Sequence, residues 1–285
     1  MSQHQSLRRQ HQSLSDIGEL VGALRNIALV EIRRIEGFVQ AQHHATAIIE
    51  AAYADFVQDH AAWLQDPAAV DEVWCVIGSE RGFCGDLNRQ LIDATRARRP
   101  ALAGRLVLVG SQLAQAWTEE GDGITTLAGA RFADEVRQVL LSLIATLTPL
   151  LQGRGTAAVG LRLLYLQEQG VTERRLLPAP LPRQAQPRRS HPVRLLLPVT
   201  AYLEALLAQW LSSALTDALY IALLHENQLR LEHMEQARRR IDERLDALAR
   251  RSNRARQDEI TEEIEVILLT AGTERPPGKW GSRSC

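Results

Sequence analysis

The sequence predicts an α/β fold plus a coiled coil: long antiparallel N- and C-terminal helices with an inserted Rossmann-like α/β domain. Two observations predict the helices. Apolar residues recur in steps of three and four near both ends of the chain, and aromatic residues make up only 5% of its 285 residues. A third observation predicts the inserted domain, because short apolar runs alternate with helical segments in the middle of the chain.

The N-terminal helix is predicted over residues 14–58, and we assign residues 1–66 to it as a coiled-coil segment. No proline interrupts this stretch. Glu31 and Gln42 break an otherwise apolar seam with a heptad-like repeat. The seam consists of Leu14, Ile17, Val21, Leu24, Ala28, Ile35, Phe38, Ala45, Ile49, Ala52 and Phe56.

Residues 67–198 form the predicted Rossmann-like domain and a linker rich in proline and arginine. Short, continuously apolar strands that alternate with helices are typical of a parallel sheet covered on both faces. The strands are expected at 71–78, 105–110 and 156–166, and the helices at 87–98, 111–117 and 132–147. The linker, 178–198, is expected to be extended, with one short strand at 193–197.

The C-terminal segment, residues 199–285, is predicted to be a second coiled-coil helix followed by a tail. From 199 to 270 it contains neither proline nor glycine, and an apolar stripe runs along it. Gly272 and the Pro276-Pro277 pair end it. Since both terminal segments carry such a stripe, the simplest fold pairs them antiparallel, with the α/β domain inserted between them.

Composition excludes several classes of protein. A net charge of −1 and a pI of about 6.7 give no field that would attract nucleic acid. The three cysteines (Cys75, Cys84 and Cys285) do not form a disulfide framework, and no histidine has the spacing of a metal site, so we expect neither cofactor nor metal. The N-terminus lacks the apolar core of a secretory signal, and no apolar run approaches the roughly 20 residues of a membrane span. We therefore expect a soluble or peripheral protein.

The first predicted strand ends in a glycine-rich turn, Gly-Ser-Glu-Arg-Gly-Phe-Cys-Gly-Asp-Leu-Asn, over residues 78–88. In a doubly wound sheet, the loop after such a strand is a common ligand-binding position. Three interpretations compete. The turn is a phosphate cradle, although the known motif spacings are absent; or Cys84 is a nucleophile, although no histidine base lies between residues 63 and 182; or the turn is structural, with an exposed binding edge.

A second polar stretch, Asn-Arg-Ala-Arg-Gln-Asp-Glu-Ile-Thr-Glu-Glu-Ile over residues 253–264, lies late in the C-terminal helix. The usual meaning of such a run is a solvated helix face with ion pairs between residues four apart. The sharper interpretation is a polar surface that recognises a surrounding protein. The sequence alone leaves both open.

Three segments resemble the γ subunit of F-type ATP synthases. Residues 79–88 resemble the family's S-D-R-G-L-C-G-G-L-N, and residues 253–264 resemble N-K-A-R-Q-A-A-I-T-Q-E-L. Residues 202–234 resemble the family's entry into its last helix. The order and position of the segments also match, so the resemblance covers about residues 14–271.

The resemblance implies a mechanical part with no catalytic site or cofactor of its own. It implies that the coiled coil lies inside a ring of three α and three β subunits, and that the α/β domain lies near the ε subunit and the c-ring. Rotation of this shaft couples ion flow through the c-ring to the nucleotide affinities of the β subunits. It also implies a location peripheral to the cytoplasmic side of the bacterial inner membrane. Two alternatives are kept: a cysteine-dependent α/β hydrolase using Cys84, and a coiled-coil adaptor protein.

The resemblance also implies partner-binding residues. Residues 256–257 match an Arg-Gln pair that hydrogen-bonds a β-subunit loop, and the turn at 79–88 matches the segment that faces the moving arm of β. Residues 20–34 align without gaps with the family's I-T-K-A-M-K-M-V-A-A-A-K-L-R-R. The expected partner-binding residues are Arg33, Arg34, Glu80, Arg81, Cys84, Arg254, Arg256 and Gln257.

Several positions depart from the family's motifs. Glu31 replaces a lysine, Glu80 replaces an aspartate and Asp86 replaces a glycine. The linker at 178–198 and the tail from residue 273 are also unusual in composition. These departures suggest the hypothesis that the chain belongs to a divergent branch, from a second synthase that coexists with a standard one.

Overall fold

The computed structural model of the chain describes residues 3–60, 71–98, 105–118, 123–152, 159–179 and 195–273. They form two compact units. Unit 1 comprises Met1–Leu24 and Met234–Cys285, and unit 2 comprises Arg25–His233. Both boundaries fall inside the two long helices, α1 (Gln3–His60) and α5 (Val199–Thr273).

Unit 2 contains a five-stranded sheet with the strand order β3-β2-β1-β4-β5. Strands β1 to β4 are parallel, and β5 pairs antiparallel with β4. The predicted parallel sheet is therefore correct in its three central strands, while the sequence analysis missed both edge strands: a short parallel strand at one edge and an antiparallel hairpin strand at the other. The strands are β1 (Asp71–Ile77), β2 (Arg105–Val109), β3 (Ile124–Leu127), β4 (Val159–Gln167) and β5 (Gly170–Leu177).

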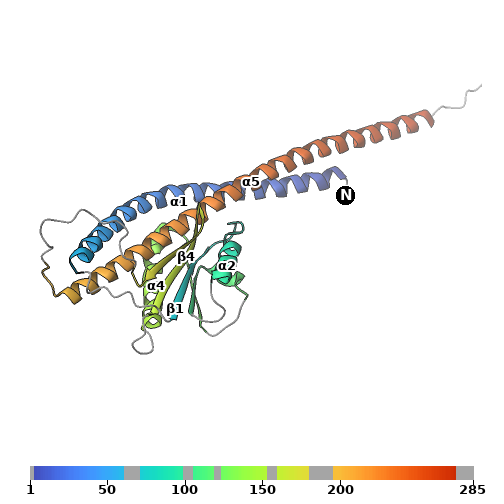
Figure 1. Ribbon diagram of the computed structural model, residues 1–285. Coiled ribbons are helices and arrows are strands. Elements are labelled where there is room, and N and C mark those ends of the chain that lie inside the picture. The colour runs from blue at the N-terminus through green and yellow to red at the C-terminus, as the bar shows by residue number, and fades with distance from the viewer. Residues whose placement is uncertain are drawn as a thin grey trace, which may run out of the picture. The chain divides into compact units, whose positions relative to one another are not determined.

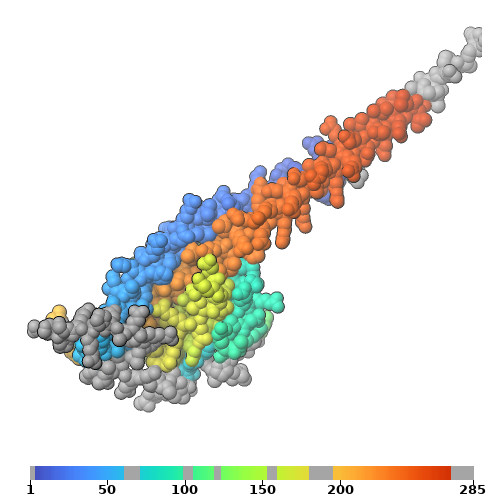
Figure 2. Space-filling model, turned by 45° about the horizontal axis from the view of Figure 1, so that its top comes forward, coloured from blue at the N-terminus to red at the C-terminus, as the bar shows by residue number. Residues whose placement is uncertain are grey.

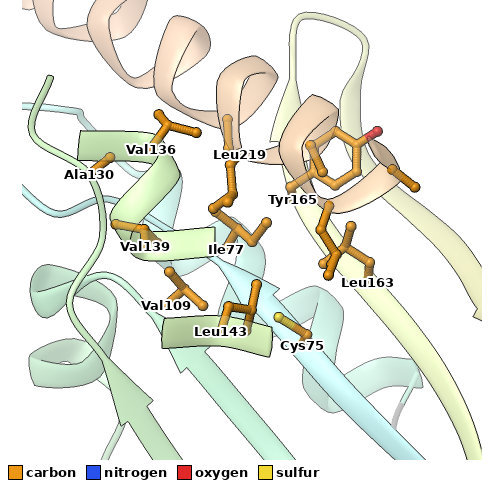
Figure 3. Close-up of a cluster of buried hydrophobic side chains, with 14 of the residues drawn as sticks. Cys75, Ile77, Val109, Ala130, Val136, Val139, Leu143, Leu163, Tyr165 and Leu219 are labelled. Atoms are coloured by element: carbon orange, nitrogen blue, oxygen red, sulfur yellow. The ribbon is translucent and has the colours of Figure 1, made fainter. Parts of the chain in front are cut away.

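Helices cover both faces of the sheet, as predicted. On one face lie α2 (Leu87–Arg98) and α3 (Ser111–Ala116), which pack against Trp74 and Val76 of β1. On the other face, α5 and α4 (Val136–Leu151) pack against Val73, Cys75 and Ile77. Figure 3 shows Leu219 of α5 pointing toward this face, beside the α4 side chains. The continuous apolar pattern of β1 thus results from burial on both faces.

In unit 2, α1 and α5 lie side by side and pair in opposite chain order (Figures 1 and 2), which confirms the predicted antiparallel pair. The ring centroids of Phe38 and Tyr220 are 5.5 Å apart, and those of Phe56 and Tyr202 are 5.6 Å apart. Unit 1 shows the same order: Arg238 donates a hydrogen bond of 2.8 Å to the Gly18 carbonyl, and the earlier residues 9–17 share a groove with the later residues 244–251.

A buried carboxylate joins the helix pair to the sheet edge in unit 2. Asp217 of α5 lies 3.1 Å from His43 Nε2 on α1 and 3.7 Å from Arg174 Nη1 on β5. Burial raises the pKa of Asp217, and His43 and Arg174 act against that rise. Burying the charge of Asp217 therefore costs free energy, and the side chains that offset this cost come from two other elements.

Some boundaries differ from the predictions. α1 begins at Gln3 instead of residue 14, and α4 starts at Val136 after the short helix η2 (Ala133–Glu135). Of the short strand expected at 193–197, residues 195–197 are not a strand and the rest lie outside the described residues, as does most of the 178–198 linker. The segmentation at 66/67 and 198/199 stays a prediction, since the compact units cut each long helix instead.

One described helix is long and apolar enough, by composition, to cross a membrane, which the sequence analysis did not expect. Within Val199–Thr270, an 18-residue window has a mean hydropathy of 1.3. Half of this window is buried. Trp210, Ala214 and Leu215 belong to the core beneath α5, so packing on the sheet explains the apolar composition.

Candidate functional sites

The glycine-rich turn after β1 has a fixed backbone. Ser79 N–H donates to Asn88 Oδ1 at 3.1 Å, and Asn88 Nδ2 donates to Ser79 Oγ at 2.8 Å. Phe83 has a φ of 65° and Gly85 a φ of 62°, both in the left-handed region. The Phe83 side chain is 69% exposed. The turn therefore presents an aromatic side chain from a constrained backbone, an arrangement suited to contact with a partner.

Glu80 joins the ends of three parallel strands. Its carboxylate accepts hydrogen bonds from Ser111 N–H at 2.8 Å, Ser111 Oγ at 3.0 Å and Gly129 N–H at 2.8 Å. Ser111 follows β2 and Gly129 follows β3, while Glu80 itself follows β1. Glu80 is only 8% exposed. Its side chain therefore acts inside the domain. The expected role of Glu80 at a partner interface stays a prediction, and in that role Glu80 would act indirectly, by fixing the shape of the turn.

The same turn is held by one helical turn of α5. Glu226 accepts hydrogen bonds from Glu80 N–H at 3.2 Å and Arg81 N–H at 3.4 Å. Arg230 donates to Gly82 O at 3.2 Å and also contacts the Glu226 carboxylate. Those two N–H groups are the donors that a phosphate would need. Because a protein carboxylate already occupies them, the geometry argues against the phosphate-cradle interpretation.

The electrostatics of the turn argue against a nucleophilic cysteine. Burial raises the pKa of Cys84 to about 11, and Glu226 adds to that rise, while Arg230 and Arg81 act against it. Arg230 Nη2 lies 3.2 Å from Cys84 Sγ. His233 of α5 does approach the turn at Gly85, a neighbour that its distance in sequence concealed. A thiol that stays protonated at neutral pH is a poor nucleophile, so the hydrolase alternative loses its chemical basis.

Arg81 connects the turn to the start of α4. It donates a 3.1 Å hydrogen bond to Asn227 Oδ1, and its guanidinium lies 5.0 Å from the centroid of the Phe132 ring. Burial lowers the pKa of Arg81 and Arg230 lowers it further, while Glu226 and then Glu31 act against the fall. Arg81 is thus a half-buried structural cation with one side toward solvent.

The two arginines predicted on α1 have different surroundings. Arg33 is exposed. Arg34 Nη2 lies 2.6 Å from Asp134 Oδ1 at the start of α4. One turn earlier, Glu31 is buried and accepts a 2.7 Å hydrogen bond from Ala133 N–H. Arg33 is therefore free to face a partner, whereas Arg34 is engaged within the chain.

The end of α5, in unit 1, forms a second candidate site. Arg254, Arg256 and Gln257 are exposed on it, as the partner-binding prediction requires. Beyond them the helix becomes apolar while remaining exposed (red in Figure 2), and all of residues 261–270 are exposed. The large apolar side chains there are 46% to 72% exposed: Ile260, Ile264, Val266, Ile267, Leu268 and Leu269.

Unit 1 also contains a groove between α1 and α5, with a volume of about 680 Å³. Leu14, Ile17 and Leu248 line it together with three arginines. Among the described residues of the whole chain, no group of three His, Cys, Asp or Glu side chains is placed to hold a metal ion.

The family model described as ATP synthase matches residues 3–272. The chain belongs to this ATP synthase family. The ATP synthase gamma chain of Frankia casuarinae is 26% identical over 302 residues, covering 93% of this chain and 97% of that one. The gamma chain of Moorella thermoacetica is 24% identical over 288 residues, covering 95% of this chain and 99% of that one.

A solved structure shares the fold of this γ-type chain. A chain from the rotor of the Euglena gracilis mitochondrial ATP synthase, in rotational state 1, superposes with a TM-score of 0.57 at 14% identity. The match covers 90% of this chain and 98% of that one. At this identity the likeness concerns the fold alone.

Sequence reasoning missed the residues of this γ-type chain that hold the turn from outside it. Glu226, Asn227 and Arg230 lie about 145 residues away in sequence. Their signal was present: a charged pair four residues apart, just after the apolar first part of the helix. Glu31 gave a similar signal, since it breaks the apolar seam of α1.

Proposed function

We propose that this chain is the central rotor shaft of a rotary F-type ATP synthase. In this role it couples ion flow through a c-ring to changes in nucleotide affinity at the catalytic β subunits. Family membership and the names of the relatives support the assignment. The shaft works as a subunit and has no catalytic site or cofactor of its own; the protonated state of Cys84 supports this part of the proposal.

The exposed apolar end of α5 is the observation that carries the proposal. Six large apolar side chains between Ile260 and Leu269 are 46% to 72% exposed. A contiguous apolar surface of this kind indicates a protein partner that covers it. In the proposed assembly, the ring of α and β subunits surrounds this helix end and removes it from water. The polar group just before it, Arg254, Arg256 and Gln257, then faces acceptors of the same ring.

Rotation acts on the β subunits only through unequal contacts. The conformational states of a β subunit make different contacts with the shaft. The shaft shifts the equilibrium between these states by the difference in free energy of those contacts. The end of α5 offers polar contacts through Arg254, Arg256 and Gln257, and apolar contacts through the exposed side chains between Ile260 and Leu269. At the turn after β1, the exposed Phe83 is the contact that we assign to the moving arm of β.

The remaining partners follow from the same assignment. The α/β domain contacts the ε subunit and the c-ring, and the chain reaches the membrane only through that complex. The bacterial sources of the relatives support a location peripheral to the cytoplasmic side of the inner membrane. No nucleic acid is expected, because the net charge is only −1.

Co-expression with the α and β subunits of the same organism tests the proposal. We expect the three chains to elute together in size-exclusion chromatography and to hydrolyse ATP. Arg256→Ala is expected to lower ATP turnover without weakening the fold, since Arg256 is exposed. Arg240→Ala, also exposed on α5, is the matched control. If this chain instead elutes alone and ATPase activity is independent of it, the shaft role is refuted and the adaptor alternative is favoured.

A further inference from the structure

Glu31 makes a contact that the family motif does not explain. Glu31 is only 6% exposed and is one of the two polar residues that break the apolar seam of α1. Its carboxylate accepts a 2.7 Å hydrogen bond from Ala133 N–H, the first residue of η2. Phe132, which precedes that helix, supplies no side-chain cap. The start of η2 thus leaves the Ala133 N–H without a side-chain acceptor from Phe132, and Glu31 of α1 supplies the acceptor instead.

A second contact lies one helical turn along α1. Arg34 Nη2 is 2.6 Å from Asp134 Oδ1, the next residue of η2. Both of these side chains are about half exposed, so this ion pair contributes little free energy by itself. Together, the two contacts define the α1 attachment: Glu31 and Arg34 to Ala133 and Asp134. The buried hydrogen bond of Glu31 is its stronger part.

The other long helix has its own attachment to the same edge of the sheet. Glu226 and Arg230 of α5 hold the turn at 80–84, which follows β1. The η2 helix follows β3, two strands away in the sheet. In a parallel sheet these are the carboxyl ends of the strands, so α1 and α5 are fixed at two separated points of one edge. Two separated points resist rotation of the helix pair against the sheet better than one.

The chemistry of position 31 suits the α1 attachment and departs from the aligned family motif. The aligned family motif has a lysine here. A lysine ammonium carries only donors and cannot accept a hydrogen bond from Ala133 N–H. A carboxylate accepts it and is also attracted by Arg81.

We propose that Glu31 is a positioning residue that fixes α1 to the α/β domain, so that both helices of the shaft transmit torsion to that domain. This inference rests on the proposed function. Without this attachment, only α5 among the described parts of the two helices makes charged hydrogen bonds to the loops at the carboxyl ends of the strands, while α1 keeps the 3.3 Å ion pair of Glu50 with Arg174 in the middle of β5. The attachment then adds torsional stiffness between the part of the shaft that β subunits grip and the domain assigned to the c-ring.

The first test uses the purified full chain and hydrogen exchange at the peptide that contains Ala133. Glu31→Ala is expected to speed exchange there by about tenfold or more, because it removes a buried charged acceptor. Glu31→Gln keeps one acceptor oxygen and is expected to give an intermediate rate. Glu36→Lys, at an exposed position on the same helix, is the matched control and is expected to exchange like the wild type. Equal exchange in all four proteins would overturn the attachment.

The second test measures stiffness in the complex with α and β subunits. A bead is bound to a cysteine introduced at Gln115, an exposed position on α3, and its angular fluctuation is recorded with the ring immobilised and ATP hydrolysis stalled. Glu31→Ala is expected to widen the angular distribution, Glu31→Gln to restore most of the stiffness, and Glu36→Lys to leave it unchanged.

The outcomes separate the two proposals. If the wild-type chain does not assemble with α and β, the shaft role fails, and torsional transmission by Glu31 fails with it. If the wild type assembles and turns over ATP, but Glu31→Ala fluctuates like the wild type, the shaft role stands and the positioning role is refuted. Faster exchange without a wider distribution would make Glu31 a local contact only, which also contradicts the proposal.

Discussion

Replacing Glu80 by alanine removes the acceptor that joins three strand ends. The Ser111 and Gly129 N–H groups, each 2.8 Å from Glu80 Oε2, lose their partner, and Ser111 Oγ loses its 3.0 Å contact. Leaving a buried donor unsatisfied costs about 1–3 kcal/mol. Both donors are only partly buried, so water replaces some of the loss and the lower half of that range applies to each. The sum over the two backbone donors is about 2–4 kcal/mol of unfolding free energy.

Urea unfolding of the purified chain, followed by tryptophan fluorescence, measures this loss. Trp74 and Trp117 are buried in the domain that Glu80 joins, so the signal reports on its unfolding. Arg89→Ala, at an exposed position of the helix that follows the turn, is the control and is expected to change stability by less than about 0.5 kcal/mol. A Glu80→Ala variant as stable as the control would show that the three hydrogen bonds do not hold the strand ends, and the reasoning would be wrong.

Three further perturbations test other parts of the account. Gly110→Ala places a Cβ 2.7 Å from a carbonyl oxygen of the Gly78–Ser79 segment at a φ of 118°, whereas Gly123→Ala, at a φ of 108°, meets no atom within 4 Å. In urea unfolding, we expect the first to cost at least about 1–2 kcal/mol more than the second, and equal losses would contradict the clash. Burial raises the folded-state pKa of Asp217 above its ordinary value of 3.8, so the stability of the wild type relative to Asp217→Asn should fall as pH rises through that folded pKa. Urea midpoints of both proteins from about pH 3.5 to 7 check the sign, and a difference that is flat or rises with pH would contradict it. Cys84→Ala should leave ATP turnover of the assembled complex within about twofold of the wild type, because the pKa of about 11 keeps the thiol protonated; abolished activity would favour a nucleophile.

Much of this fold is predictable from local patterns. The seam of α1 and the stripe of α5 follow from steps of three and four residues, and β1 and β2 follow from short apolar runs. The edge strands were missed for physical reasons. β3 has only four residues, too short for a pattern, and β5 carries charged residues such as Glu173 and Arg174 because one of its edges is open.

The interior of the candidate site was less predictable, because its contacts join residues far apart in sequence. The motif around Cys84 marked the turn, but nothing in it shows that Glu226 takes the backbone donors. Burial of Glu80 and Cys84 depends on α5 packing over the sheet, a tertiary event that periodicity does not encode. By contrast, the exposed Arg254, Arg256 and Gln257 follow from their place on a helix end without a packing partner among the described residues.

Single-molecule observation of rotation tests the central claim most directly. The ring of α and β subunits is fixed to a surface, a bead is bound to the α/β domain at Gln115→Cys, and ATP is added. If the chain is the shaft, the bead turns stepwise and in one direction, and it stops when ATP is removed. A complex that hydrolyses ATP while the bead shows only undirected fluctuation would contradict the account.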